Sequence, residues 1–165
     1  MKKISVIKIN IGDRVVPTTI YKVEKGEALP SISRVYVFAS NDNGEIALIF
    51  NDKRKIWGFP GGHTEKNEAV EQTANRECIE EIGYSLKSCE PSYVLSNKLD
   101  DDTESLQVIC FAKVGSPSNE FVDENESVST IKFVPIDGAL EKVGNFLLWE
   151  DLIKNYKTWL QKKSL

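Results

Sequence analysis

Three glutamates, Glu77, Glu80 and Glu81, lie close together in the segment GGHTEKNEAVEQTANRECIEEIGY at residues 61–84. If this stretch is helical, the three carboxylates occupy neighbouring positions and repel one another. Arg76 can pair with one of them, but a single arginine cannot neutralise three carboxylates. A divalent cation can, because Mg²⁺ and Mn²⁺ prefer hard oxygen ligands. The spacing therefore suits a metal-dependent site and equally a surface helix laced with salt bridges.

Helical spacing predicts one helix here, running roughly from Glu68 to Ile82. Asn67 is a suitable N-cap residue, and Gly83 stands where helices often end in a left-handed conformation. Four apolar residues then form a stripe that should face a sheet: Val70, Ala74, Cys78 and Ile82. Since Glu77, Glu80 and Glu81 border or enter this stripe, they are not an ordinary solvated face.

A glycine-rich loop precedes the predicted helix, in the sequence Trp57-Gly58-Phe59-Pro60-Gly61-Gly62. Paired glycines allow backbone to approach a ligand or metal closely. His63 follows directly and is either a substrate contact or base, or simply a loop residue. The basic run at 53–55 could steer phosphates, although ordinary surface charge explains it equally well. Strand, glycine loop and acidic helix together suit a metal–phosphate site.

The segment resembles the signature of the Nudix hydrolases. That signature is Gly, five residues, Glu, seven residues, Arg-Glu, an aliphatic residue, any residue, Glu-Glu, any residue, Gly and an aliphatic residue. The matching positions are Gly62, Glu68, Arg76, Glu77, Cys78, Glu80, Glu81, Gly83 and Tyr84. All seven fixed positions match, and Cys78 and Tyr84 replace the usual aliphatic residues with side chains that also pack apolar surface.

The resemblance implies an α/β fold in which a mixed β-sheet is sandwiched between helices. It also implies a hydrolytic reaction. Family members typically hydrolyse a nucleoside diphosphate linked to another group, using Mg²⁺ or Mn²⁺ and a water that attacks phosphorus. By position, Glu77, Glu80 and Glu81 would bind metal, and the region of Gly62 would add a backbone carbonyl. Arg76 would orient Glu77 through a salt bridge.

The remaining roles implied by the resemblance are less specific. Glu68 would support the loop together with Gly61. Many members carry a further acid before the last strand of the sheet. The candidates for it are Glu120, Asp123, Glu124 and Glu126. Glu126 is closest to that strand and is the favoured base and additional metal ligand, while the alternative for each is a solvated loop acid.

Chain organisation is consistent with one domain over residues 1–165. Alternating or β-rich runs predict strands at 4–9, 14–24, 34–39, 45–50, 92–97, 106–114 and 130–136. Residues 1–32 are an N-terminal extension, expected to form a β-hairpin in which Pro17 requires a sheet edge or a bulge. Residues 41–44 (Asn-Asp-Asn-Gly) predict a hairpin turn, and 147–161 predict a C-terminal helix with one apolar face.

Composition limits the partners. The net charge is −4, so a duplex nucleic acid is not expected, whereas a small nucleotide derivative chelated by metal is. Three widely spaced cysteines suit reduced, buried thiols in a cytoplasmic protein, and no apolar segment reaches the roughly 20 residues that span a bilayer. The N-terminal strands could pair two subunits into a homodimer. The alternatives to an enzyme are a Nudix-like nucleotide-binding or sensor domain and a structural protein with an acidic helix.

Overall fold

The computed structural model describes residues 1–11, 13–99, 103–118, 128–144 and 146–163. Within these residues the chain forms eight strands and three helices. The strands are β1 (Lys2–Ile11), β2 (Arg14–Lys22), β3 (Arg34–Ser40), β4 (Glu45–Asn51), β5 (Ile56–Gly58), β6 (Tyr84–Lys98), β7 (Glu104–Pro117) and β8 (Val128–Pro135). The helices are α1 (Val70–Ile82), α2 (Ile136–Ala139) and α3 (Phe146–Lys163).

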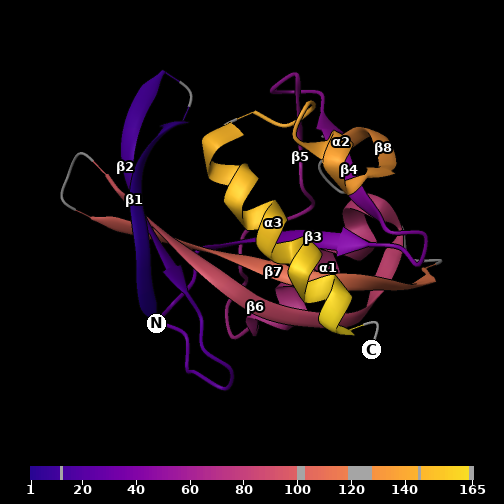
Figure 1. The fold of residues 1–165 in the computed structure, drawn as a ribbon, viewed down its shortest axis with the longest axis horizontal. Helices are drawn as coiled ribbons and strands as arrows, with labels where there is room; N and C mark the ends of the chain where they lie inside the picture. Colours follow the sequence, from indigo (N-terminus) through magenta and orange to yellow (C-terminus); the bar gives the residue numbers. More distant parts are fainter. Residues whose placement is uncertain (12, 100–102, 119–127, 145, 164–165) are drawn as a thin grey trace.

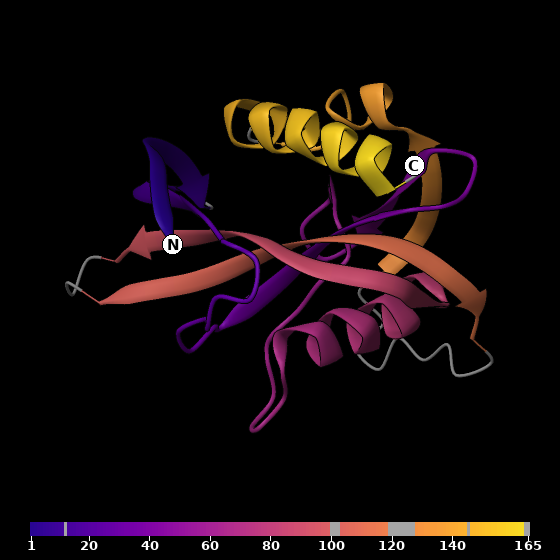
Figure 2. The same cartoon turned by 60° about the horizontal axis from the view of Figure 1, so that its bottom comes forward.

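A mixed sheet separates the two long helices, and Figure 2 shows α1 on one face and α3 on the other. Each face has its own apolar cluster. Beneath α3 the cluster contains Phe38, Phe111 and Tyr156, and beneath α1 it contains Val37 and Cys78. Val37 and Phe38 fall in different clusters because successive strand residues point to opposite faces. This is the α/β/α fold that the sequence predicts.

The sheet runs in the order β1–β2–β6–β7–β3–β4–β5, and β8 pairs with β4 (Figure 1). Its described pairs are antiparallel except β3 and β7, which are parallel. The predicted turn at 41–44 does connect β3 to β4, but the two strands pair only at Ser40 and Ile46. β4 then pairs with β8 along its length. This early separation leaves the edge of β3 open to the segment that follows β5.

The first two strands pair antiparallel, and β2 continues the sheet by pairing with β6 from Thr18 onward. Pro17 is therefore in an interior strand, not in the edge strand or bulge that the sequence predicts, and it pairs with Lys8 of β1. It lies one residue before the pairing with β6 begins. Among the described residues, the segment before Thr18 has a strand on one side only, so a residue without an N–H is tolerated there.

The first turn of α1 differs from the prediction. The helix begins at Val70, and Ala69, not Asn67, occupies the N-cap position. Asn67 lies in the preceding loop with a left-handed φ of 65°. Gln72 supports the helix start, since Ala69 N–H donates a hydrogen bond to its Oε1 at 2.8 Å. The chain turns at Asn67, and this turn places Glu68 beside the helix, not inside it.

The faces of both long helices follow the predicted periodicity. In α1, Ala74, Cys78 and Ile82 are buried, and Val70 is half-buried. The same helix also buries Glu77, whose residue is only 8% exposed. In α3 the predicted face is formed by residues that are buried or pack against the core: Leu148, Leu152, Tyr156, Trp159 and Leu160. No helix in the described ranges is both long and apolar enough to cross a membrane.

Replacing Gly83 by Ala should lower the free energy of unfolding by about 1 kcal/mol, because a Cβ is disfavoured in the left-handed region. Gly83 has a φ of 76°, and its N–H closes α1 by donating to Ile79 O at 3.1 Å. Urea unfolding followed by tryptophan fluorescence measures the loss. The matched control is Gly138→Ala, because a Cβ at Gly138 meets no heavy atom within 4 Å. Equal destabilisation of both variants would contradict the prediction.

Candidate active site

The glycine loop is bound to the open edge of β3 like an additional strand. Val37 N–H donates to Pro60 O at 2.8 Å, and Val35 N–H donates to Gly62 O at 2.9 Å. An isolated β-bridge also joins His63 to the start of β3. The sheet therefore fixes the path of the loop through backbone contacts, independently of the charged side chains nearby.

Both glycines of the loop are required by close packing. A Cβ at Gly61, where φ is 149°, would overlap the carbonyl oxygen of Val35. A Cβ at Gly62 would overlap the carboxylate of Glu77. In addition, Gly61 N–H donates to Glu81 Oε2 at 2.8 Å. The loop backbone thus touches two of the three predicted carboxylates, which is the close approach that paired glycines allow.

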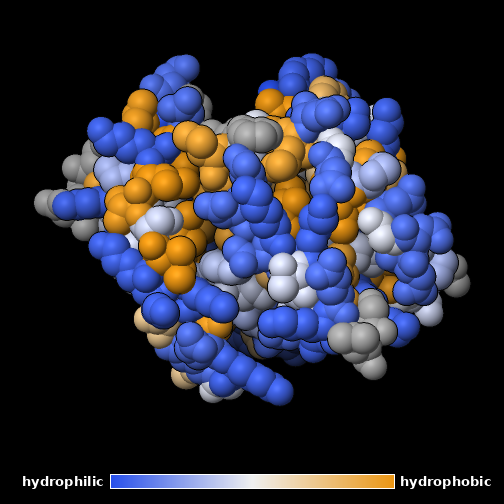
Figure 3. All heavy atoms as spheres, viewed as in Figure 1, coloured by the Kyte–Doolittle hydropathy of each residue, from blue (hydrophilic) through white to orange (hydrophobic). Residues whose placement is uncertain are grey.

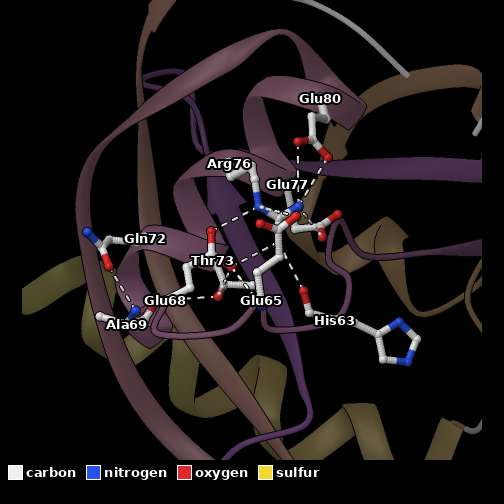
Figure 4. Close-up of polar contacts among 9 residues, drawn as sticks. All are labelled: His63, Glu65, Glu68, Ala69, Gln72, Thr73, Arg76, Glu77 and Glu80. Atoms are coloured by element: carbon white, nitrogen blue, oxygen red, sulfur yellow. Dashed lines mark hydrogen bonds and ion pairs between the residues drawn. The ribbon is translucent and has the colours of Figure 1, made fainter. Parts of the chain in front are cut away.

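Arg76 lies at the centre of the charged residues (Figure 4). Its Nε donates to Glu68 Oε1 at 2.9 Å, and one terminal nitrogen donates to Glu77 Oε1 at 2.8 Å and Glu80 Oε2 at 3.2 Å. The other terminal nitrogen donates to His63 O at 2.9 Å and Glu68 Oε2 at 3.0 Å. These contacts use all five N–H donors of the guanidinium. The ion pair between Arg76 and Glu77 that the family resemblance implies is therefore present.

Glu68 is a carboxylate whose charged form the surrounding donors stabilise. The hydrogen bonds from Arg76 are the main cause that lowers the pKa of Glu68 to about 2, from an ordinary value of 4.5. The backbone N–H of Glu65 and the hydroxyl of Thr73 also donate to Glu68, at 3.1 and 2.8 Å. In return, Glu68 raises the pKa of Arg76 further above its ordinary value. Glu68 and Arg76 therefore remain charged at neutral pH.

Each of the three glutamates accepts a hydrogen bond from a protein donor in this structure. Among the described residues, no three acidic, histidine or cysteine side chains are grouped as a metal ion would require. Arg76 instead binds Glu77 and Glu80, while Gly61 N–H binds Glu81. Separate donors reduce the mutual repulsion of carboxylates that would otherwise face one another.

The donor set nevertheless suits a hard divalent cation. Glu68, Glu77 and Glu80 all form ion pairs with one guanidinium, that of Arg76. Glu81 adds a further carboxylate on the same side of α1, where it binds the loop. Carboxylate oxygens beside a close-packed glycine backbone are the ligand type that Mg²⁺ and Mn²⁺ prefer.

Two loop residues differ in detail from their expected roles. The Gly62 carbonyl already accepts the hydrogen bond from Val35, which leaves one lone pair for any further ligand. His63 contributes its backbone carbonyl to Arg76, whereas its exposed imidazole points away from the charged residues in Figure 4. The described contacts of His63 therefore match the loop role more closely than that of a base.

Other predicted residues lie apart from this cluster or outside the described residues. The candidate bases Glu120, Asp123, Glu124 and Glu126 belong to the range 119–127, which the structure does not describe. The basic residues at 53–55 are exposed, and Lys55 forms an ion pair with Asp52 at 2.9 Å.

Thr73 is a contributor that the sequence analysis misses. It is fully buried, and its hydroxyl donates to Glu68 Oε2 at 2.8 Å. Helical spacing gives no sign of this contact, because Glu68 is not in the helix and reaches Thr73 only through the turn at Asn67.

Comparison with known proteins places most of the chain in one family. The sequence model of the NUDIX domain matches residues 30–151. A Bacillus subtilis protein named "Putative 8-oxo-dGTP diphosphatase" is 34% identical over 50 residues. That match covers 30% of this chain and 34% of the relative, so the chain spans only about a third of that protein.

Solved structures share the fold at low sequence identity. The B. subtilis pyrophosphohydrolase BsRppH superimposes with a TM-score of 0.64 and 18% identity, covering 88% of this chain and 92% of the other. The NUDIX domain of Shewanella oneidensis NrtR, solved with ADP ribose, has a TM-score of 0.60 and 19% identity, with 84% and 94% covered. A C. elegans Ap4A hydrolase has a TM-score of 0.58 and 16% identity, with 80% and 99% covered.

The low pKa of Glu68 predicts a pH-dependent contribution to stability. A carboxylate whose pKa is depressed on folding stabilises the fold fully above its unfolded pKa, near 4.5, and loses that effect toward about pH 2. Glu68→Gln removes the charge and keeps the size. The difference in free energy of unfolding between wild type and this variant should be about 2–3 kcal/mol near pH 7 and shrink below about pH 4.5.

Chemical denaturation at several pH values measures this difference. The control is Glu141→Gln, which removes an exposed carboxylate after α2 and should change stability little at any pH. A Glu68→Gln difference that stays constant between about pH 7 and about pH 3 would show that the ion pair does not account for the low pKa.

Proposed function

Because the chain belongs to the Nudix family, we propose that it is a hydrolase that cleaves the diphosphate of a nucleotide derivative with Mg²⁺ or Mn²⁺. The observation that carries this proposal is the arrangement around Arg76. All four motif glutamates contact either Arg76 or the backbone of the glycine loop: Glu68, Glu77, Glu80 and Glu81. Such a site favours a cation, and through the cation an anionic substrate.

The proposed reaction is attack of water on one phosphorus of the diphosphate. The bond from that phosphorus to the bridging oxygen breaks, and two phosphate-bearing products result. A bound divalent cation supplies charge neutralisation of the diphosphate oxygens and a water of lowered pKa. The chain itself must hold its carboxylates in place, admit the diphosphate and accept the proton of the water.

The described residues suit these tasks in different ways. Glu77, Glu80 and Glu81 are the proposed metal ligands, with a carbonyl of the Gly62 region. Arg76 and Glu68 are positioning residues, because Arg76 holds the buried Glu77 at 2.8 Å while Glu68 fixes the opposite side of the guanidinium. The proton acceptor is one of the cluster carboxylates or an acid such as Glu126.

The substrate class follows from the site only in general terms. The relatives named above act on or bind 8-oxo-dGTP, Ap4A or ADP ribose, and each is a nucleotide with linked phosphates. We propose a small nucleotide derivative of this kind for the present chain. A non-catalytic binding or sensor domain is the alternative, and it would bind such a nucleotide without releasing a product.

The N-terminal strands support a further proposal about assembly. β1 is the edge strand of the sheet, and Ile4, Val6 and Val15 expose apolar side chains on the β1–β2 hairpin. An open edge beside exposed apolar residues favours pairing with a second copy. We propose a homodimer, and sedimentation equilibrium of the wild type and of Val6→Lys measures it. Identical monomer masses for both would rule it out.

Replacing Glu81 by Gln should lower kcat at least about 100-fold while leaving the fold intact. Gln retains an acceptor oxygen for Gly61 N–H but loses the negative charge that a metal ion requires. The assay measures phosphate release, with a coupled phosphatase, across nucleoside triphosphates, dinucleoside polyphosphates, ADP ribose and nucleotide sugars. Each reaction is run with Mg²⁺, with Mn²⁺ and with EDTA.

The matched control is Glu71→Gln, on the exposed side of the first turn of α1. It should keep wild-type turnover. Full activity of Glu81→Gln would refute the assigned site. Tight binding of a nucleotide with metal, without any product, would instead favour the sensor domain.

A further inference from the structure

Arg34 is a cation that the proposed reaction does not use. It begins β3, and its Nε is buried without a hydrogen-bond partner among the described residues. Within the same residues, no carboxylate lies close enough to form a salt bridge with it. A buried donor left unpaired opposes folding, so it is unusual unless a ligand completes it.

One aromatic ring lies beside this arginine, and further rings pack against that ring. The guanidinium carbon lies 5.4 Å from the ring centroid of Tyr36, which is the distance of a cation–π contact. Tyr36 meets Trp149 of α3 edge-on at 6.2 Å, and Trp149 meets Phe59 at 5.2 Å. Arg34, Tyr36 and Trp149 are each only half-buried, so part of this surface is open. These three residues are called the Arg34 surface below.

The Arg34 surface lies across the glycine loop from the carboxylates. Tyr36 and Trp149 pack with the cluster beneath α3, whereas Glu77 is on α1, on the other face of the sheet. The loop separates the two, since His63 bridges to Arg34 in register and Gly62 packs against Glu77. Figure 3 shows hydrophobic residues gathered between the β1–β2 hairpin and α3, on the side of the sheet that carries the Arg34 surface.

We propose that the Arg34 surface recognises the base of the substrate and selects a 6-oxopurine. Arginine donates two parallel hydrogen bonds to the O6 and N7 acceptors of such a base, and Tyr36 and Trp149 offer aromatic contacts. Adenine carries an amino donor in place of O6, so it leaves one arginine donor unpaired. This inference rests on the proposed function for its substrate class, but not on catalysis.

A phosphate is the other acceptor that an arginine could bind, and the surroundings favour the base. Arg34 is the one cation among the three residues of this surface, and the ring of Tyr36 lies beside it. A multiply charged phosphate needs several cations or backbone N–H groups to replace its water. A flat base with two acceptors instead matches one planar donor group beside aromatic rings.

The test measures binding of GMP, IMP, AMP and inorganic phosphate by calorimetry in EDTA, which excludes metal-dependent contributions. Wild type should bind GMP and IMP about tenfold more tightly than AMP. Arg34→Gln should abolish that preference and leave AMP affinity nearly unchanged. Arg34→Lys keeps the charge but not the planar pair of donors, so it should also lose the preference.

The matched control is Arg14→Gln, an exposed arginine at the start of β2, which should keep the preference. Thermal melts verify that each variant is folded. If Arg34→Gln does not fold, Arg34→Lys replaces it in the comparison of GMP and AMP binding. Equal affinity of wild type for GMP and AMP overturns the proposal. Equal loss of GMP, AMP and phosphate binding in Arg34→Gln also overturns it, since a phosphate contact would then be the cause.

These results separate the two proposals. If the protein hydrolyses panel compounds but binds GMP and AMP equally well, the proposed hydrolase is supported and the proposed role of the Arg34 surface is refuted. If the protein prefers GMP to AMP through Arg34 but hydrolyses no compound, the proposed role of the Arg34 surface is supported and a binding domain is favoured over an enzyme.

Discussion

The guanidinium of Arg76 is the contact on which the rest of the site depends. It joins the loop through His63 O, the turn before α1 through Glu68, and the helix itself through Glu77 and Glu80. A lysine could not replace it, because a single ammonium has three donors and no planar fork. The buried position of Glu77 is tolerable for the same reason, since an unpaired buried carboxylate would strongly oppose folding.

This constraint begins in the sheet. β4 leaves β3 after a single pair, and the loop takes the vacated edge through hydrogen bonds to Val35 and Val37. The loop can lie that close to β3 and α1 only where it has no side chains, at Gly61 and Gly62. Backbone geometry therefore places the loop, the loop offers its carbonyl at His63, and Arg76 connects that carbonyl to the carboxylates.

Much of this could be predicted from sequence because it depends on local periodicity. The apolar stripe of α1, its end at Gly83 and the turn at 41–44 all follow from side-chain spacing and conformational preference. The start of α1 could not, since the turn at Asn67 is determined by the distant pairing of Glu68 with Arg76. The donors to the glutamates could not be predicted for a related reason: spacing reveals repulsion, but not which donors relieve it.

The same loop gives the two faces of the sheet different chemistry. Toward α1 it meets the carboxylates held by Arg76, and toward α3 it meets Arg34, whose Nε has no partner among the described residues and whose guanidinium lies over Tyr36. A nucleotide has the complementary division, with a charged phosphate end and a flat base that carries neutral acceptors. Because β3 fixes the loop, the distance between the two regions is set by the sheet and not by flexible side chains. A substrate that bridges the loop would thus be selected by the fit of both ends at once.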